Sequence, residues 1–140
     1  MHVLVLDTAL DACQAVVGSA VGVIAHERLT PSTGQSEAIV ALADRALDAA
    51  GLTYSDIDRI GVVVGPGSFT GLRVGVAAAR GLSPVIVCPV VGISSLVALA
   101  ASVPACEAGP CAAAVDARHG AVYAQLFEPG LVPVGEAAHV

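Results

Sequence analysis

The sequence predicts an α/β fold in which helices cover the faces of a mixed sheet. The first observation is the order of its patterns. Three strand-like apolar runs come first, and helix-like and strand-like runs then alternate, giving βββαβαβα. The second is composition, since 56% of the 140 residues are hydrophobic and only 13% are charged. A chain of this kind can bury one complete core and the beginning of a second.

The amino-terminal third predicts an antiparallel meander followed by a helix. The first strand is an uninterrupted apolar run that ends at Asp7, and a short turn joins the next two. The three strands are expected at residues 2–6, 11–18 and 21–29. A helix from Gln35 to Ala50 follows, with Gly51 as its stop. Its apolar stripe is Ile39, Leu42, Ala43, Ala46, Leu47 and Ala50, and its acidic edge is Glu37, Asp44 and Asp48.

The middle of the chain alternates strand and helix around a glycine-rich segment, residues 65–73. A strand enters this segment and a helix leaves it, and a further strand and a capped helix follow. These elements are expected at residues 59–64, 70–82, 85–88 and 95–102.

After Pro110 the opening pattern returns, which predicts an internal duplication. An apolar strand ends at Asp116 as the first strand ends at Asp7, and two further strands are expected at 121–127 and around 131–134. Two domains follow from this: residues 1–105, and residues 106–140 as the start of a truncated second half.

Charge and hydropathy exclude several classes of function. The net charge is −6, and there is neither a lysine nor a basic run, so any RNA must be held mostly by another chain. The uncharged stretch 81–106 is broken by prolines and serines and is no membrane span. With no signal peptide visible, a cytoplasmic protein with reduced cysteines is expected, in which Cys106 and Cys111 are small apolar residues.

The glycine-rich segment could receive a phosphate, a partner protein or only a neighbouring strand. A glycine loop between a strand and a helix places backbone N–H groups where an anion binds well. Yet the chain lacks the lysine of a Walker loop, and Gly65, Gly67 and Gly71 do not fit the dinucleotide fingerprint. Ser68 lacks the GxSxG pattern of a nucleophile elbow, and no histidine is placed in the sequence as an obvious base for it.

Two arginines suggest that the second helix docks onto another protein. Arg73 lies in the first turn, where the helix dipole disfavours a cation, and Arg80 lies two turns later with small residues between them. A solvated arginine pair is the alternative, and we favour a docking face. The acidic edge of the first helix could pair with these arginines through opposite charge.

The remaining polar residues form no catalytic constellation in the sequence. Asp7 and Asp116 could hold a metal through water, but termination of a strand is the simpler interpretation. Thr8 and Thr70 are expected as turn or cap hydroxyls, and His119 as a turn residue. Neither a nucleophile with its base nor a zinc motif is apparent.

The segment from Gly65 to Gly75, GPGSFTGLRVG, closely resembles the TsaB (YeaZ-type) family of tRNA threonylcarbamoyladenosine biosynthesis, also labelled M22 glycoprotease-like. Weaker motifs agree in order, and together they extend the resemblance from residue 3 to about 127. They are Leu6-Asp7-Thr8, Gln35-Ser36-Glu37, Gly92-Ile93-Ser94-Ser95-Leu96, Asp116-Ala117-Arg118 and Val122-Tyr123.

This resemblance implies an actin-like, ribonuclease H-like (ASKHA) fold of two related halves and a non-catalytic role. A TsaB-like protein scaffolds and activates the complex that installs N6-threonylcarbamoyl on adenosine 37 of tRNAs reading ANN codons. Its implied partners are a TsaD-like catalytic subunit and a TsaE-like ATPase, with a homodimer when it is alone and tRNA bound only through the complex. No cofactor is implied beyond a weak or shared nucleotide contact in the complex.

The resemblance also implies two sets of site residues. Partner binding is expected from the first two helices, at Ile39, Leu42, Ala43, Ala46, Phe69, Thr70, Leu72, Arg73, Val76, Ala77 and Arg80. A degenerate phosphate loop is expected at Asp7, Thr8, Gly65, Gly67, Ser68 and Asp116.

The chain departs from the family pattern at two points. It has Gln35 where family members often have histidine, and it is shorter than they usually are. The alternatives to the scaffold are an actin-like nucleotide-binding enzyme and an M22-type metallopeptidase.

Overall fold

The computed structural model describes residues 1–30 and 35–140, except for the side chains of residues 35–37 and 118. The chain divides into two compact units. One consists of residues 1–64 and 68–92, and the other of residues 65–67 and 93–140. Each unit is described by itself below.

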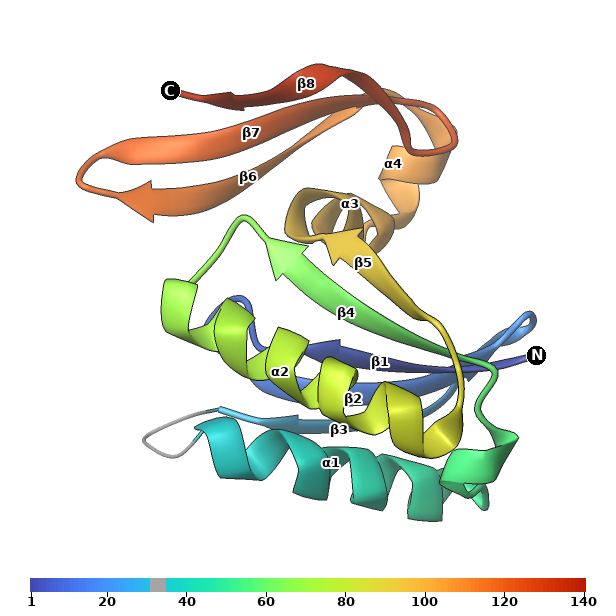
Figure 1. The fold of residues 1–140 in the computed structure, drawn as a ribbon. Helices are drawn as coiled ribbons and strands as arrows, with labels where there is room; N and C mark the ends of the chain where they lie inside the picture. Colours follow the sequence, from blue (N-terminus) through green and yellow to red (C-terminus); the bar gives the residue numbers. More distant parts are fainter. Residues whose placement is uncertain (31–34) are drawn as a thin grey trace. The chain divides into compact units, whose positions relative to one another are not determined.

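The first unit is built on a five-stranded mixed sheet with the order β3-β2-β1-β4-β5 (Figure 1). β1 pairs antiparallel with β2 and parallel with β4, so that Leu4 lies opposite both Val17 and Ile60. β2 pairs antiparallel with β3, which confirms the predicted meander. The strands are β1 (His2–Asp7), β2 (Cys13–Ser19), β3 (Gly22–Leu29), β4 (Arg59–Gly65) and β5 (Val90–Ser94).

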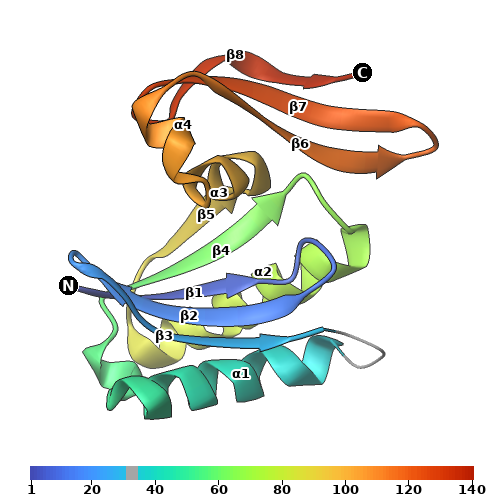
Figure 2. The same ribbon diagram turned by 180° about the vertical axis from the view of Figure 1, so that it is seen from behind.

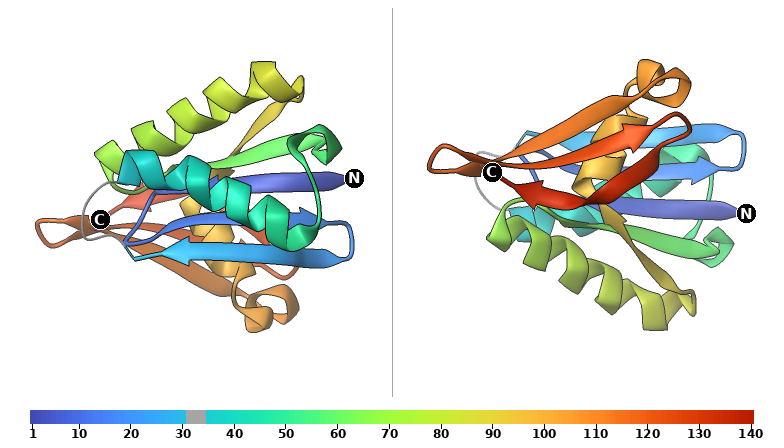
Figure 3. Two further views of the ribbon diagram at one scale, coloured as in Figure 1. Left: turned by 90° about the horizontal axis from the view of Figure 1, so that it is seen from below. Right: turned by 90° about the horizontal axis from the view of Figure 1, so that it is seen from above.

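Two helices, α1 (Gln35–Ala50) and α2 (Phe69–Ile86), lie side by side across one face of this sheet (Figure 3). Seen from behind, the strands lie in front of α2 (Figure 2). A short 3-10 helix, η1 (Tyr54–Asp56), connects α1 to β4. No helix within residues 1–30 and 35–140 is long and apolar enough to cross a membrane.

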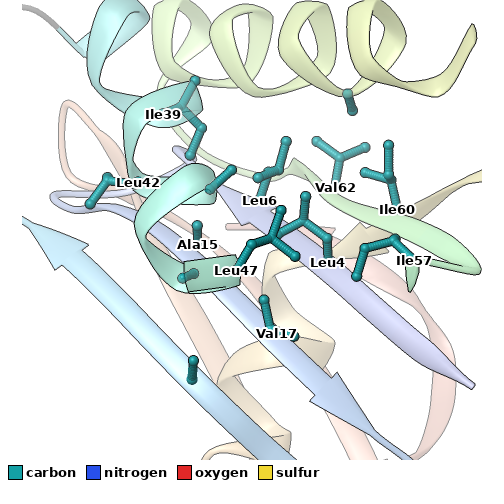
Figure 4. Packing of buried hydrophobic residues seen from close by; sticks show 14 of the residues in the cluster. Leu4, Leu6, Ala15, Val17, Ile39, Leu42, Leu47, Ile57, Ile60 and Val62 are labelled. Carbon is teal, nitrogen blue, oxygen red and sulfur yellow. The ribbon is translucent and has the colours of Figure 1, made fainter. Parts of the chain in front are cut away.

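The core of the first unit lies between these helices and the sheet (Figure 4). Because side chains alternate along a strand, Leu4 and Leu6 of β1 point to the same face and meet the stripe of α1. Every apolar residue predicted for that stripe lies in or against the core. Burial of this stripe, rather than intrinsic propensity, is what makes α1 a stable helix.

The prediction was wrong at the end of the second helix. The predicted strand at 85–88 does not form, since α2 continues through Pro84 to Ile86 and β5 begins only at Val90. The β-branched run after Pro84 has strand composition, but Val85 is 77% exposed and Val87 closes the helix with a φ of 53°. These residues form the last turn of α2 and its cap instead, and the segment contacts the core through Ile86 and Cys88.

The second unit contains two short helices and a three-stranded antiparallel sheet with the order β6-β7-β8. The helix at 95–102 and all three predicted strands are confirmed, and the five-residue helix α4 was not predicted. Phe127 and Val115 point to the buried side of the sheet. The elements are α3 (Ser95–Ala101), α4 (Pro104–Ala108), β6 (Cys111–Arg118), β7 (Ala121–Glu128) and β8 (Val132–His139).

Candidate functional site

The start of α2 is the feature around which the candidate site is built. Ser68 caps the helix, and its hydroxyl oxygen accepts a hydrogen bond from the backbone N–H of Gly71 at 3.3 Å. The preceding bond, Gly65–Pro66, is a cis peptide, and Gly65 has a φ of 111°, which favours glycine. Ser68 therefore fixes the amino-terminal end of α2, whose first turn begins at Phe69.

The inner side of this turn is filled by the loop that follows β1. The backbone N–H of Ser68 donates to the carbonyl oxygen of Ala9 at 2.7 Å, and the buried hydroxyl of Thr8 donates to the carbonyl oxygen of Gly71 at 2.6 Å. A Cβ at Gly71 would overlap the carbonyl oxygen of Thr8, and one at Gly75 would lie 2.6 Å from the Thr8 hydroxyl. Both glycines are thus required by close packing against Thr8, the residue that follows β1.

These contacts bear on the predicted phosphate loop. The N–H of Ser68 and the hydroxyl of Thr8 donate inside the first unit, and the hydroxyl oxygen of Ser68 accepts a hydrogen bond there. Gly65 and Gly67 belong to the other unit, as does Asp116. The role of this set in binding phosphate remains a prediction.

Asp7 is held by its neighbours at the end of β1. One carboxylate oxygen accepts the backbone N–H of Ala9, and the other accepts the side-chain amide of Gln14, each at 2.9 Å. The amide oxygen of Gln14 lies 3.0 Å from Nε2 of His26 on β3. This arrangement ties the turn to the meander and favours a strand-terminating role for Asp7.

Nowhere in residues 1–30 and 35–140 do three His, Cys, Asp or Glu side chains gather closely enough to hold an ion. The side chain of Gln35, at the position where the family often has histidine, is outside the described part.

The outer face of α2 carries most of the predicted partner-binding residues. Leu72 and Val76 are half-buried at the edge of this face, and the others are exposed. We call the exposed set the α2 outer face; it consists of Phe69, Thr70, Arg73, Ala77 and Arg80. Within the described part of the chain, neither arginine makes an ion pair.

A stack between Arg73 and Phe69 explains how a cation is tolerated in the first turn of α2. The guanidinium carbon of Arg73 lies 3.8 Å from the centre of the Phe69 ring, which is itself 68% exposed. The electron-rich face of an aromatic ring attracts a cation and offsets part of its repulsion by the helix dipole. The sequence interpretation missed this pair, although its i, i+4 spacing could have revealed it.

The predicted partner-binding residues of α1 face the core and not a partner, so we correct that assignment. Ile39, Leu42, Ala43 and Ala46 are completely buried in the core of the first unit. A stripe that packs on the sheet cannot also meet a partner. The exposed side of α1 carries Val40, Ala41, Asp44, Arg45, Asp48 and Ala49 instead.

Part of the predicted acidic edge of α1 is already engaged. Asp44 accepts a hydrogen bond from the hydroxyl of Tyr54 at 2.8 Å. Burial raises the pKa of Tyr54 above its ordinary value near 10, and the bond to Asp44 raises it further. Arg45 lies 3.4 Å from the carboxylate of Glu27 on β3, while Asp48 is exposed and the side chain of Glu37 is outside the described part.

The cysteines differ from the expectation that all are reduced. Cys106 and Cys111 are joined in a disulfide, whereas Cys13 and Cys88 remain thiols, and burial raises the pKa of each. His119 is a turn residue as predicted, with a φ of 55° in the β6–β7 hairpin.

Comparison with known proteins identifies related chains. The family model described as "TsaD: tRNA N6-adenosine threonylcarbamoyltransferase" matches residues 30–136. The tRNA threonylcarbamoyladenosine biosynthesis protein TsaB of Escherichia coli is 35% identical over 124 residues, which cover 88% of this chain and 53% of that protein. This chain thus spans about half the length of that curated relative.

Solved structures agree with the family match. YeaZ from Pseudomonas aeruginosa superimposes with a TM-score of 0.88 at 27% identity, covering 99% of this chain and 66% of that one. The ROK hexokinase from Thermus thermophilus matches with a TM-score of 0.61 at 21% identity, over 98% of this chain and 49% of the hexokinase, and shows the fold alone. The predicted actin-like α/β fold is confirmed.

Proposed function

This chain belongs to the family described as "TsaD: tRNA N6-adenosine threonylcarbamoyltransferase", and from that premise we propose that it is a non-catalytic scaffold in tRNA threonylcarbamoyladenosine biosynthesis. The α2 outer face is the observation that carries this proposal. It presents the small residue Ala77 between two arginines, on a helix whose opposite side packs closely against the residue after β1 through Gly71 and Gly75. Small residues allow another helix to approach closely, and a rigid face loses little entropy when it binds.

The partner in this proposal is a TsaD-like catalytic subunit, with a TsaE-like ATPase as the third member. The complex acts in the cytoplasm on adenosine 37 of tRNAs that read ANN codons, and tRNA is held by the other subunits because this chain has a net charge of −6. The protein forms a homodimer when it is alone. What supports the non-catalytic part is that Ser68, Thr8 and Asp7 make their hydrogen bonds within the first unit.

Co-purification with the TsaD-like subunit of the same organism tests the proposal. Arg73→Glu and Ala77→Glu place a negative charge on the α2 outer face, and each is expected to weaken binding roughly tenfold or more. Ala77 is the better central position, because Val76 packs partly against the core and its replacement would also disturb the fold.

Arg59→Glu is the matched control for Arg73→Glu. It makes the same change of charge at an exposed residue at the start of β4, away from the α2 outer face. Binding should survive this substitution. Undiminished co-purification of both α2 variants would refute the scaffold proposal.

The proposal includes no tightly bound cofactor. A nucleotide-binding enzyme is the competing function, because the hexokinase match shares the fold. Calorimetry with Mg²⁺ and ATP separates the two. The scaffold predicts a Kd above about 1 mM for the isolated chain, equivalent to roughly −4 kcal/mol.

A further inference from the structure

The disulfide between Cys106 and Cys111 lies in the second unit and plays no part in the proposed function. Its Cα atoms are 5.3 Å apart, within the range that a disulfide spans. Cys106 is in α4, and Cys111 is the first residue of β6. The disulfide therefore joins a helix to a strand, and only four residues separate the two cysteines.

Besides the disulfide, α4 has its own backbone hydrogen bonds, such as that from the N–H of Gly109 to the carbonyl oxygen of Ala105 at 3.0 Å, and it packs against α3. Five residues are too few for a helix to be stable by itself, and the residue before it, Val103, provides no side-chain cap. The carbonyl oxygen of Glu107 accepts the backbone N–H of Gly130 at 3.1 Å, which ties α4 to the turn between β7 and β8. Loss of the disulfide would therefore loosen α4 and this turn together.

The other end of the disulfide borders the core of the second unit. Cys111 pairs in register with Phe127, whose side chain is almost completely buried. β6 and β7 remain paired over seven positions without help from the disulfide, from Cys111 to Arg118 on β6. The sheet should thus persist when the disulfide opens, so that only its α4 end changes.

The two cysteine residues differ in their exposure to solvent. Cys106 is buried and Cys111 is half-buried. An incoming thiolate can approach the sulfur of Cys111 more readily, and Cys106 would then leave as the thiolate. The geometry permits exchange without unfolding of the sheet.

We propose that Cys106 and Cys111 form a reversible redox switch that orders or releases the α4 end of the second unit. In the reducing direction, a low-molecular-weight thiol attacks the sulfur of Cys111, forms a mixed disulfide and releases the Cys106 thiolate, which takes up a proton. A second molecule of the thiol attacks the mixed disulfide and frees Cys111. The two small thiols leave as one small-molecule disulfide, which accounts for both electrons and both protons. Oxidation by that small-molecule disulfide is the reverse.

A redox titration of the full chain tests the switch. The protein is equilibrated in buffers of reduced and oxidised glutathione at several ratios, quenched by alkylation and weighed by mass spectrometry. The closed form lacks two hydrogens and is lighter by about 2 Da before labelling, and it leaves Cys106 and Cys111 unlabelled. The expected result is a reversible transition between the two forms within the series.

Amide hydrogen exchange then reports what the switch moves. Reduction is expected to speed exchange by roughly tenfold or more in residues 104–111 and 129–131 and to leave α1 and α2 unchanged. A Cys106→Ala/Cys111→Ala variant should exchange like the reduced protein under all conditions. Cys88→Ala is the control, since it removes a thiol of the first unit and should leave the transition intact.

Three results would overturn the proposal. The pair could stay closed at every glutathione ratio, it could stay open at every ratio, or exchange at residues 104–111 could be the same in both forms. If the double alanine variant does not fold, the titration and exchange of the unmodified chain still decide.

Discussion

Two glycines of α2 have opposite surroundings. A Cβ at Gly71 would overlap the carbonyl oxygen of Thr8, whereas one at Gly81 would meet nothing within 4 Å. Gly71→Ala should therefore force β1 and α2 apart and lower the free energy of unfolding by about 3 kcal/mol. Urea unfolding followed by circular dichroism measures this change.

Gly81→Ala is the matched control on the same helix. It removes backbone freedom from the unfolded chain at an exposed helical position and should raise the free energy of unfolding by about 0.5–1 kcal/mol. If both substitutions change the free energy of unfolding in the same direction, the close approach of Thr8 to Gly71 does not hold β1 and α2 together.

At the same scale, the sequence identified the residues of the α2 start but not their contacts. The strand-terminating role of Asp7 and the exposed arginines follow from local patterns and agree with the structure. The contact between Thr8 and Gly71 joins positions far apart in the chain, and no local pattern records it. The buried stripe of α1 was assigned both to the core and to a partner, and the packing on the sheet leaves only the first role.

Among the elements, η1 is fastened to α1 through Tyr54. The hydroxyl of Tyr54 donates to Asp44, and the pKa of this tyrosine is raised, first by burial and then by Asp44. The unfolded chain loses this proton near pH 10, while the folded chain keeps it. The contribution of Tyr54 to stability is therefore complete below pH 10 and is lost as the pH rises above that value.

Tyr54→Phe should flatten the alkaline part of the stability profile. The effect is expected to be roughly half a kcal/mol at pH 11, because partial exposure of the pair screens it. Comparison of urea unfolding at pH 8 and pH 11 measures it. The chain contains no lysine, so no lysine titrates between pH 8 and pH 11. The thiols of Cys13 and Cys88 are present in both the unmodified protein and the variant, so their effect cancels in the comparison. An equal loss of stability in both proteins would contradict this role.

Helices and strands were predictable where their patterns are long. α1 spans the residues predicted because its apolar stripe is regular over four turns. The end of α2 was not predictable, since Pro84 and the valines after it favour a break and a strand by composition. α4 has only five residues and too little periodicity to be recognised.

For the whole molecule, the topology followed from the sequence more fully than the chemistry of its cysteines. Both meanders were expected from apolar runs that end at Asp7 and Asp116. The disulfide was missed because two cysteines five positions apart can be bridged only if the backbone between them turns back, and that turn depends on α4. Long patterns predict where the strands lie along the chain, and the local backbone geometry decides whether the disulfide can form.

The proposed homodimer and the proposed complex with the TsaD-like subunit give a prediction for the assembly. If a second copy and the TsaD-like subunit both bind the α2 outer face, they must compete, because two helices cannot occupy the same surface. Sedimentation velocity of the chain alone should show a concentration-dependent dimer, and addition of the TsaD-like subunit should convert it to a heterodimer without a larger species.

The two charge variants test whether both assemblies use this face. Ala77→Glu should abolish both assemblies, and Arg59→Glu should abolish neither. A stable complex that contains two copies of this chain joined through α2 together with the TsaD-like subunit would show that the faces are separate, and Ala77→Glu would then disrupt only one of the two contacts.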